Sequence, residues 1–309
     1  VNGEPIADET LGRLTEQVLD LADGMEDFPT EFELMTAVGM AFFAEQKCDI
    51  VVLEVGLGGR MDSTNVIPAP EVAVLTNIGL EHTQELGNTV ALIAKEKSGI
   101  LKPGCRCVLY HQSRGAEEGV EGVCRELSIP LTVTAPDTLK VQSVGLDGQV
   151  FSYRDAGTFR LSLLGEYQRY NAITALDIIW SLREKGWKIS DEAIQRGLAD
   201  SKWPGRLELA RRYPDFILDG GHNPQCVDAL MEALEELFPH EKLIFLTGVL
   251  ADKDWQGMMR RAMPLAKAFV TITPDSPRAL AGEELAAWLR KQGFEAVSCD
   301  SVEEGVDKV

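Results

Sequence analysis

The chain has 309 residues, of which 45% are hydrophobic and 26% charged, as in a globular protein of about two domains. Its formal net charge of −19 argues against a nucleic-acid partner, because a polyanion would be repelled. No apolar run approaches the roughly 20 residues that a membrane span needs, and we expect no signal peptide. The six cysteines form no C-x-x-C pair, so we expect free thiols in a cytoplasmic protein without a zinc site.

The sequence pattern of the first part of the chain predicts helices, two buried strands and a β-rich edge. Thr30 and Glu33 fit a capping box at the start of the second helix. The apolar runs 50–55 and 72–75 each precede glycine or polar residues and predict buried strands. Expected helices cover about 8–22, 30–43, 89–97, 115–127, 166–184 and 191–199, and expected β-runs within 105–164 are 106–110, 131–133, 148–153 and 159–163.

The segment Trp203-Pro204-Gly205-Arg206 interrupts this pattern and marks the predicted domain boundary, with domains at 1–203 and 204–309. Strands and helices alternate regularly beyond it. The strands are expected near 216–219, 242–247, 268–272 and 294–298, and the helices near 224–237, 255–262 and 281–291. This alternation predicts a parallel sheet covered by helices on both faces.

Glu54 ends the first predicted strand, and Gly56-Leu57-Gly58-Gly59 follows it. Ligands of α/β proteins bind at the C-terminal ends of such strands, so this carboxylate is well placed for a metal or a substrate. The alternative is a carboxylate exposed to water or paired with Arg60. The glycines match a dinucleotide-binding loop only weakly, because their spacing differs and no helix opens behind them.

His82 lies just beyond the next predicted strand. Two neighbouring parallel strands would place Glu54 and His82 side by side, which favours a Mg²⁺ or Mn²⁺ site. A lone histidine is otherwise more often a structural residue. Lys97 would by default be a solvated helix residue, since Lys95 shares its helix.

Asp219 and His222 lie in the segment Asp-Gly-Gly-His-Asn-Pro that follows the run 216–218. Asn223 and Pro224 fit the N-cap and first position of a helix. Capping explains these two residues but not the pair Asp219 and His222. Arg206 follows Pro-Gly at the domain junction and is either a surface arginine or a guanidinium that reaches a phosphate.

Taken together, these segments resemble the folylpolyglutamate synthase/dihydrofolate synthase family within the Mur ligase group. The resemblance runs from Val1 to about Ala281 with the motifs in order. The matching segments lie at 54–65, 76–82, 86–89, 96–104, 168–172, 204–206, 219–224, 252–254 and 276–278. The resemblance implies a P-loop-ATPase-like α/β domain with a β-rich edge, followed by a Rossmann-like parallel-sheet domain.

The resemblance also implies roles for single residues. Glu54 and His82 are similar to the magnesium ligands of the family, and Lys97 to a lysine that becomes carbamylated. Asp62 lies where the family binds the pterin of its substrate. The residues similar to ATP contacts are Asn171, Arg206 and Asp219, with His222 in the same motif.

The implied activity is ATP-dependent addition of L-glutamate to a folate or dihydropteroate carboxylate through an acyl phosphate. One departure is severe: no Gly-Lys dipeptide occurs in the chain, whereas the family has a Gly-rich P-loop with Gly-Lys-Ser or Gly-Lys-Thr. We therefore expect a fragment, shortened at both ends, that is inactive by itself. Glu81, Ser63, Ser98 and Gly221 are milder departures.

Two alternatives stay open: a UDP-muramoyl peptide ligase and a non-catalytic folate-binding pseudoenzyme. The expected partners are small molecules only, with no nucleic acid and no membrane, and the expected state is a monomer. The sequence does not distinguish dihydrofolate synthase, folylpolyglutamate synthase and a bifunctional enzyme, nor does it set polyglutamate length or metal preference.

Overall fold

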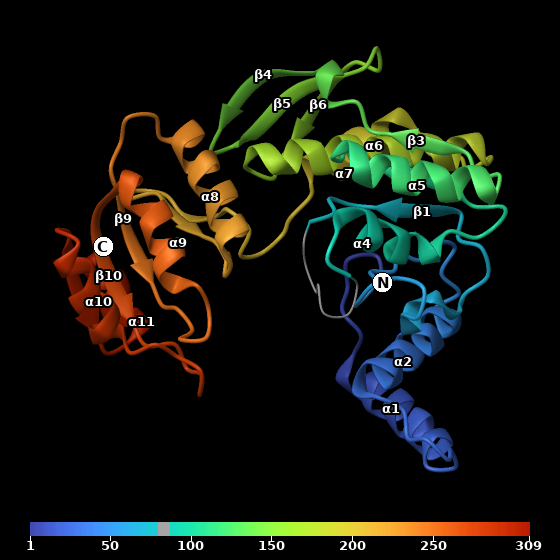
Figure 1. Ribbon diagram of the computed structural model, residues 1–309, viewed down its shortest axis with the longest axis horizontal. Coiled ribbons are helices and arrows are strands. Elements are labelled where there is room, and N and C mark those ends of the chain that lie inside the picture. Colours follow the sequence, from blue (N-terminus) through green and yellow to red (C-terminus); the bar gives the residue numbers. More distant parts are fainter. Residues whose placement is uncertain (80–86) are drawn as a thin grey trace. The chain divides into compact units, whose positions relative to one another are not determined.

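A computed structural model describes residues 1–79 and 87–309 of the chain (Figure 1). The described chain forms two compact units. The first contains residues 1–134 and 180–187, and the second contains residues 135–179 and 188–309. The predicted boundary between residues 203 and 204 is a different partition of the chain and stays a prediction.

The first unit begins with two helices, α1 (Asp8–Ala22) and α2 (Glu31–Glu45). The capping box at Thr30 is confirmed: the backbone N–H of Glu33 donates to the Thr30 hydroxyl, and the backbone N–H of Thr30 donates to the Glu33 carboxylate. This exchange satisfies two N–H groups that the first turn of a helix leaves free.

The first unit also holds a parallel sheet with the strand order β1-β2-β3. Its strands are β1 (Val72–Leu75), β2 (Arg106–Leu109) and β3 (Leu131–Val133), and its helices are α4 (Val90–Lys97) and α5 (Arg114–Glu126). Short 3₁₀ turns, η1 (Ser63–Val66) and η2 (Ser98–Ile100), accompany them. Buried apolar residues of β1, β2, α4 and α5 form one core, so strands and helices in this unit bury a shared apolar layer.

The expected strand at 50–55 is wrong. This segment is extended but belongs to no strand, and Val52 is 92% exposed. A strand requires a neighbour that completes its hydrogen-bond ladder. Within the described residues, β1 pairs only with β2 and leaves 50–55 without such a neighbour.

The second unit begins with an antiparallel sheet in the order β4-β5-β6. These strands are β4 (Leu139–Gly145), β5 (Gly148–Tyr153) and β6 (Thr158–Leu161). Burial alternates along β5 and β6, which is the pattern of strands with one face packed and one exposed. This confirms the predicted runs 148–153 and 159–163 of the β-rich edge. The runs 106–110 and 131–133 instead supply β2 and β3 of the parallel sheet, and β4 was not predicted. The helices α6 (Glu166–Glu184) and α7 (Asp191–Ala199) follow, and residues 180–187 of this stretch belong to the first unit.

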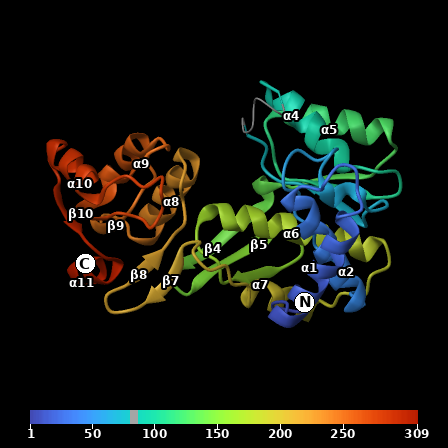
Figure 2. The ribbon, with the colours of Figure 1, turned by 90° about the horizontal axis from the view of Figure 1, so that it is seen from below.

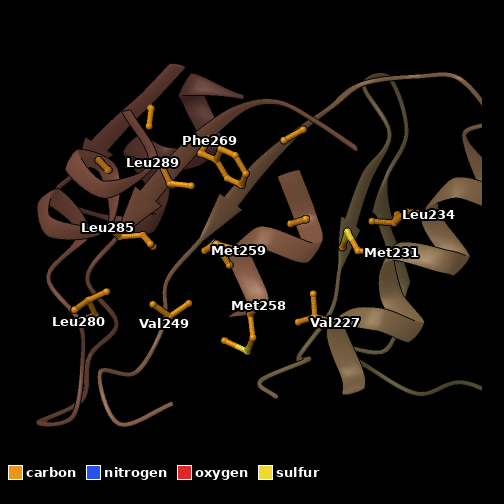
Figure 3. Packing of buried hydrophobic residues seen from close by; sticks show 14 of the residues in the cluster. Val227, Met231, Leu234, Val249, Met258, Met259, Phe269, Leu280, Leu285 and Leu289 are labelled. Carbon is orange, nitrogen blue, oxygen red and sulfur yellow. The ribbon is translucent and has the colours of Figure 1, made fainter. Parts of the chain in front are cut away.

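The rest of the second unit contains a parallel sheet in the order β11-β10-β9. Its strands are β9 (Leu243–Thr247), β10 (Ala266–Ile272) and β11 (Glu295–Cys299). The accompanying helices are α8 (Pro224–Leu237), α9 (Trp255–Ala262), α10 (Gly282–Lys291) and α11 (Val302–Lys308), with 3₁₀ turns η3 (Pro136–Thr138) and η4 (Met263–Leu265) elsewhere in the unit. Figure 3 shows the core between them, where Phe269 lies near Leu289 and Met259.

The strand at 216–218 does not join this parallel sheet. It forms β8 (Phe216–Leu218), which pairs antiparallel with β7 (Glu208–Arg211) in a two-stranded ribbon (Figure 2). The expectation that it belongs to the parallel sheet is therefore wrong. β8 instead forms its backbone hydrogen bonds with β7, a segment that was not predicted as a strand.

None of the helices in residues 1–79 and 87–309 combines the length and the hydropathy that a membrane span requires.

Candidate functional site

Arg206 is held by a tight turn over residues 203–206. The Arg206 N–H donates to the Trp203 carbonyl over 3.3 Å. Pro204 occupies the second position, and Gly205 occupies the third with φ +69°. These are the residues that a type II turn favours, because only glycine adopts a positive φ there without strain. The Gly205 N–H also donates to the Glu208 carboxylate over 2.8 Å, so the turn is fixed in place.

Asp219 fixes the adjacent loop. Its two carboxylate oxygens accept hydrogen bonds from the N–H groups of Leu207, at 3.0 Å, and Gly221, at 2.8 Å. The Gly220 N–H donates to the Gly205 carbonyl over 2.8 Å. A Cβ atom on Gly220 would lie 3.0 Å from Nη1 of Arg206. The structure therefore places Asp219 and Arg206 in one cluster, with glycine at the point of closest approach.

The same loop leads into α8, as the sequence predicts. The Asn223 side chain accepts a hydrogen bond from the Cys226 N–H over 2.8 Å, and Pro224 is the first helical residue. His222 is exposed, and its Nδ1 lies 3.1 Å from the Gly220 carbonyl. Capping therefore accounts for Asn223 and Pro224, while His222 stays available to a ligand.

A pocket of about 400 Å³ in the second unit brings two predicted residues together. Asn171 comes from α6 and Arg206 from the turn. The Asn171 side-chain amide donates to the Gln168 side-chain oxygen over 3.0 Å. The complete lining is Leu161, Leu163, Tyr167, Gln168, Asn171, Ala172, Ala175, Leu198, Ser201, Trp203 and Arg206.

Tyr167 links this pocket to the Asp219 loop. The pKa of Tyr167 is raised to about 12, chiefly by burial and in addition by the Asp219 carboxylate, while Arg206 opposes the rise. Sequence reasoning missed Tyr167 as well as Trp203. Tyr167 lies four residues before Asn171 and Trp203 three residues before Arg206. Each directly precedes a matching segment, Gln-x-x-Asn or Pro-Gly-Arg, and this proximity is the signal that could have found them.

Asp62 organises a second loop, in the first unit. One carboxylate oxygen accepts from the N–H groups of Gly56 and Leu57, both at 2.9 Å. The other accepts from the N–H and the hydroxyl of Thr64, at 2.9 Å and 2.6 Å. Burial acts to raise the pKa of Asp62, but these four hydrogen bonds together lower it. Its predicted contact with a pterin stays a prediction.

This loop packs against the end of α4, which carries Lys97. A Cβ atom on Gly59 would lie 2.7 Å from the Lys97 carbonyl oxygen, and one on Gly99 would lie 2.5 Å from the Arg60 Cα atom. The two glycines therefore allow two backbone segments to touch. Arg60 pairs with Glu96 at 3.4 Å, so the alternative in which Arg60 pairs with Glu54 is not observed.

The predicted metal ligands are only partly described. Glu54 is exposed, and no hydrogen bond or ion pair involves its carboxylate within the described residues. His82 lies outside the described residues. Residues 1–79 and 87–309 hold no group of three His, Cys, Asp or Glu side chains that could bind a metal. A free carboxylate suits Mg²⁺, which takes one or two protein oxygens and keeps several waters.

Two protein-family comparisons match the chain. The family described as "Mur ligase middle domain" matches residues 15–179, and "Mur ligase, glutamate ligase domain" matches residues 205–309. Among individual proteins, the dihydrofolate synthase/folylpolyglutamate synthase of Bacillus subtilis is 36% identical over 296 residues, which cover 92% of this chain and 69% of that protein.

Comparison with solved structures gives the same family as the sequence comparisons. The folylpolyglutamate synthase of Thermotoga maritima is 32% identical with a TM-score of 0.88, covering 100% of this chain and 73% of that one. The Mycobacterium tuberculosis folylpolyglutamate synthase, solved with ADP and AMPPCP, is 29% identical with a TM-score of 0.83, covering 99% of this chain and 72% of that one. The chain therefore belongs to the folylpolyglutamate synthase/dihydrofolate synthase family of Mur ligases.

Proposed function

We propose that this chain carries the adenine-nucleotide site of an ATP-dependent ligase that joins L-glutamate to a folate or dihydropteroate carboxylate. One observation carries the proposal. Asn171 and Arg206 line one pocket, and the Asp219 loop is hydrogen-bonded to the turn that bears Arg206. An amide and a guanidinium in a mostly apolar pocket, with the Asp219 loop fixed beside the guanidinium, suit a ligand with a base, a ribose and phosphates.

In the proposed reaction, a carboxylate oxygen of the pteroyl substrate attacks the γ-phosphorus of ATP, and ADP leaves. The product is an acyl phosphate. The amine of L-glutamate then attacks its carbonyl carbon, loses a proton, and expels phosphate. Arg206 would hold phosphate oxygens as negative charge moves, which is the role a planar guanidinium performs well.

Magnesium fits this proposal through Glu54 and, outside the described residues, His82. When bound, the ion would neutralise phosphate charge. A carbamylated Lys97 is part of the same proposal, because it would replace a cation by a carboxylate-like group beside the Asp62 loop. A monomeric state and a cytoplasmic location stay predictions.

The test of nucleotide binding is calorimetric titration of the chain with ADP. Charge-assisted hydrogen bonds contribute about 1.5–3 kcal/mol, so Arg206→Ala should weaken ADP binding roughly tenfold or more. Arg125→Ala, an exposed arginine in the other unit, is the control. Undetectable ADP binding by the wild-type chain, or equal affinity in Arg206→Ala, would contradict the proposal.

Turnover is a separate question. The 309 residues contain no Gly-Lys-Ser or Gly-Lys-Thr, the segment whose lysine and backbone N–H groups hold the β- and γ-phosphates. We therefore expect nucleotide binding without ATP-dependent glutamate addition by this chain alone. Release of ADP that depends on both a pteroyl substrate and L-glutamate would refute this expectation, and the same dependence on a UDP-muramoyl substrate would favour the peptide-ligase alternative.

A further inference from the structure

We propose that Trp203 is the surface on which the base of the nucleotide stacks, and that it contributes to the choice of purine over pyrimidine. The inference rests on the proposed nucleotide site. Trp203 lines the pocket with Asn171 and Arg206, yet its residue is 61% exposed. A large indole left in water beside a pocket offers a flat apolar face to a ligand.

The turn explains why this indole lies beside a phosphate-binding cation. Trp203 and Arg206 are the first and fourth residues of the turn, whose hydrogen bond joins them directly. The Cα atoms of such residues lie within about 7 Å of each other. A ligand that reaches Arg206 with its phosphates therefore has Trp203 within range of its other end.

The remaining pocket walls suit a base. Leu161, Leu163 and Leu198 supply apolar contacts. The Asn171 and Gln168 side chains supply amide groups, and Gln168 is buried, so its orientation is restricted. Apolar walls with a pair of amide groups match a flat heterocycle with polar edges, whereas phosphate needs cations or N–H groups.

Two other tryptophans of the unit, Trp255 and Trp288, are partly buried and make contacts within the chain that Trp203 lacks. Trp255 packs edge-on against Trp288, with ring centroids 5.2 Å apart. Arg260 lies over the Trp288 ring at 5.8 Å. No ring or cation contact of Trp203 occurs within residues 1–79 and 87–309, which leaves its face free for a ligand.

Adenosine tests the inference because it carries the base without phosphates. When an aromatic side chain that stacks on a base is removed, the affinity for that base falls roughly fivefold to a hundredfold. Trp203→Leu should therefore weaken adenosine binding, measured by calorimetry, by about tenfold. Trp203→Phe should remain within about threefold of wild type, and uridine should bind the wild type more weakly than adenosine.

Phe28→Leu is the matched control, since Phe28 is an aromatic residue of similar exposure, 58%, outside this pocket. Thermal melting checks that all variants fold. Wild-type adenosine binding that Trp203→Leu leaves unchanged would overturn the stacking role and leave the proposed function standing. A wild-type chain that binds neither adenosine nor ADP would overturn the nucleotide site itself, and the stacking role with it.

Discussion

The Asp62 carboxylate shows how one side chain can hold a loop whose backbone makes few bonds of its own. It accepts four hydrogen bonds, from Gly56, Leu57 and both donors of Thr64. Each of these donors would otherwise face water or another donor. The geometry of residues 56–64 therefore depends on the charge state of this one group.

Replacing Asp62 by Asn should lower the free energy of unfolding by about 1–2 kcal/mol at pH 7, because an amide group would face the N–H groups of Gly56 and Leu57. The folded-state pKa of Asp62 is depressed, so its contribution is present above the unfolded pKa of about 3.9 and is lost as pH falls below it.

Urea unfolding of wild type and variant from pH 7 to pH 3 measures this difference. We expect the gap between the two proteins to shrink below about pH 4. Asp49→Asn, at an exposed position, is the control. A gap that stays constant through the acid range would show that the carboxylate charge is not involved.

Local signals made some residues predictable. Thr30 and Asn223 were identified as N-caps because a cap depends only on residues three or four positions away. Tyr167 and Trp203 were missed because their place in the pocket depends on how α6 and the 203–206 turn pack together. No sequence spacing encodes that packing directly.

At the scale of elements, the contact between the 56–62 loop and the end of α4 depends on glycine. A methyl group on Gly99 would meet the backbone Cα and N atoms of Arg60 at 2.5 Å and 2.7 Å, and backbone atoms cannot turn aside as a side chain can. Gly99→Ala should therefore destabilise the chain by about 1–3 kcal/mol.

Gly122→Ala provides the contrast within α5, because a methyl group there would meet nothing within 4 Å. It should stabilise the chain by about 0.5–1 kcal/mol through helix propensity. Denaturant midpoints of the two variants test this difference in sign. Equal effects would mean that the loop moves away from α4 without cost.

A buried polar network joins α6, β5 and α8. Arg169 is 3% exposed and donates to the Gln149 side chain over 2.6 Å and to the Glu236 carboxylate over 3.0 Å and 3.1 Å. Gln149 is fully buried and donates in turn to the carbonyls of Leu163 and Gly165. The Nε atom of Arg169 has no partner within the described residues.

Replacing Arg169 alone should lower the free energy of unfolding more than replacing both Arg169 and Glu236. Arg169→Met should lower the free energy of unfolding by about 3–5 kcal/mol, and Glu236→Leu by about 1–3 kcal/mol, since Glu236 is partly exposed. The double variant Arg169→Met/Glu236→Leu should recover part of this loss. Urea unfolding of all three measures the coupling, and additive losses would show that the pair acts independently.

Element types were easier to predict than element partners. The helices of the second unit follow from apolar periodicity, which is a local property. The segments 50–55 and 216–218 are both apolar and β-branched or aromatic, yet the first forms no strand and the second pairs with β7. Pairing depends on distant neighbours, so composition identifies a potential strand but not its sheet.

At the scale of the whole molecule, charge is unevenly distributed. Residues 1–49 contain twelve acidic and two basic side chains, within a chain whose formal net charge is −19. Self-repulsion of this kind destabilises the compact state and is screened by salt. Surface ion pairs such as Arg13–Glu45 weaken in salt but contribute little each.

The melting temperature should therefore rise by a few degrees between low ionic strength and 0.5 M NaCl. Scanning calorimetry at several salt concentrations checks this. A melting temperature that falls with salt would show that the ion pairs outweigh the net repulsion.

The two-part α/β organisation follows from the sequence because its repeating strands and helices leave few other ways to bury apolar surface. The neighbours of each candidate site residue are less predictable, because they depend on the fold of the unit that holds the residue. Glu54, Asp62 and Lys97 lie in the first unit, and Asn171 and Arg206 in the second. Their order in the chain identifies the family, and only the fold of each unit shows which of them meet.

Two cysteines of this chain offer sites for chemical labelling, and one of them lies beside the Asp219 loop. Cys105, Cys107, Cys124 and Cys299 are buried, whereas Cys48 and Cys226 are partly accessible. Cys226 lies in the first turn of α8, and its Cβ would be 3.4 Å from a methyl group on Gly221 in the Asp219 loop. An alkylating reagent would therefore label two thiols, Cys226 beside the Asp219 loop and Cys48 in the other unit as an internal reference.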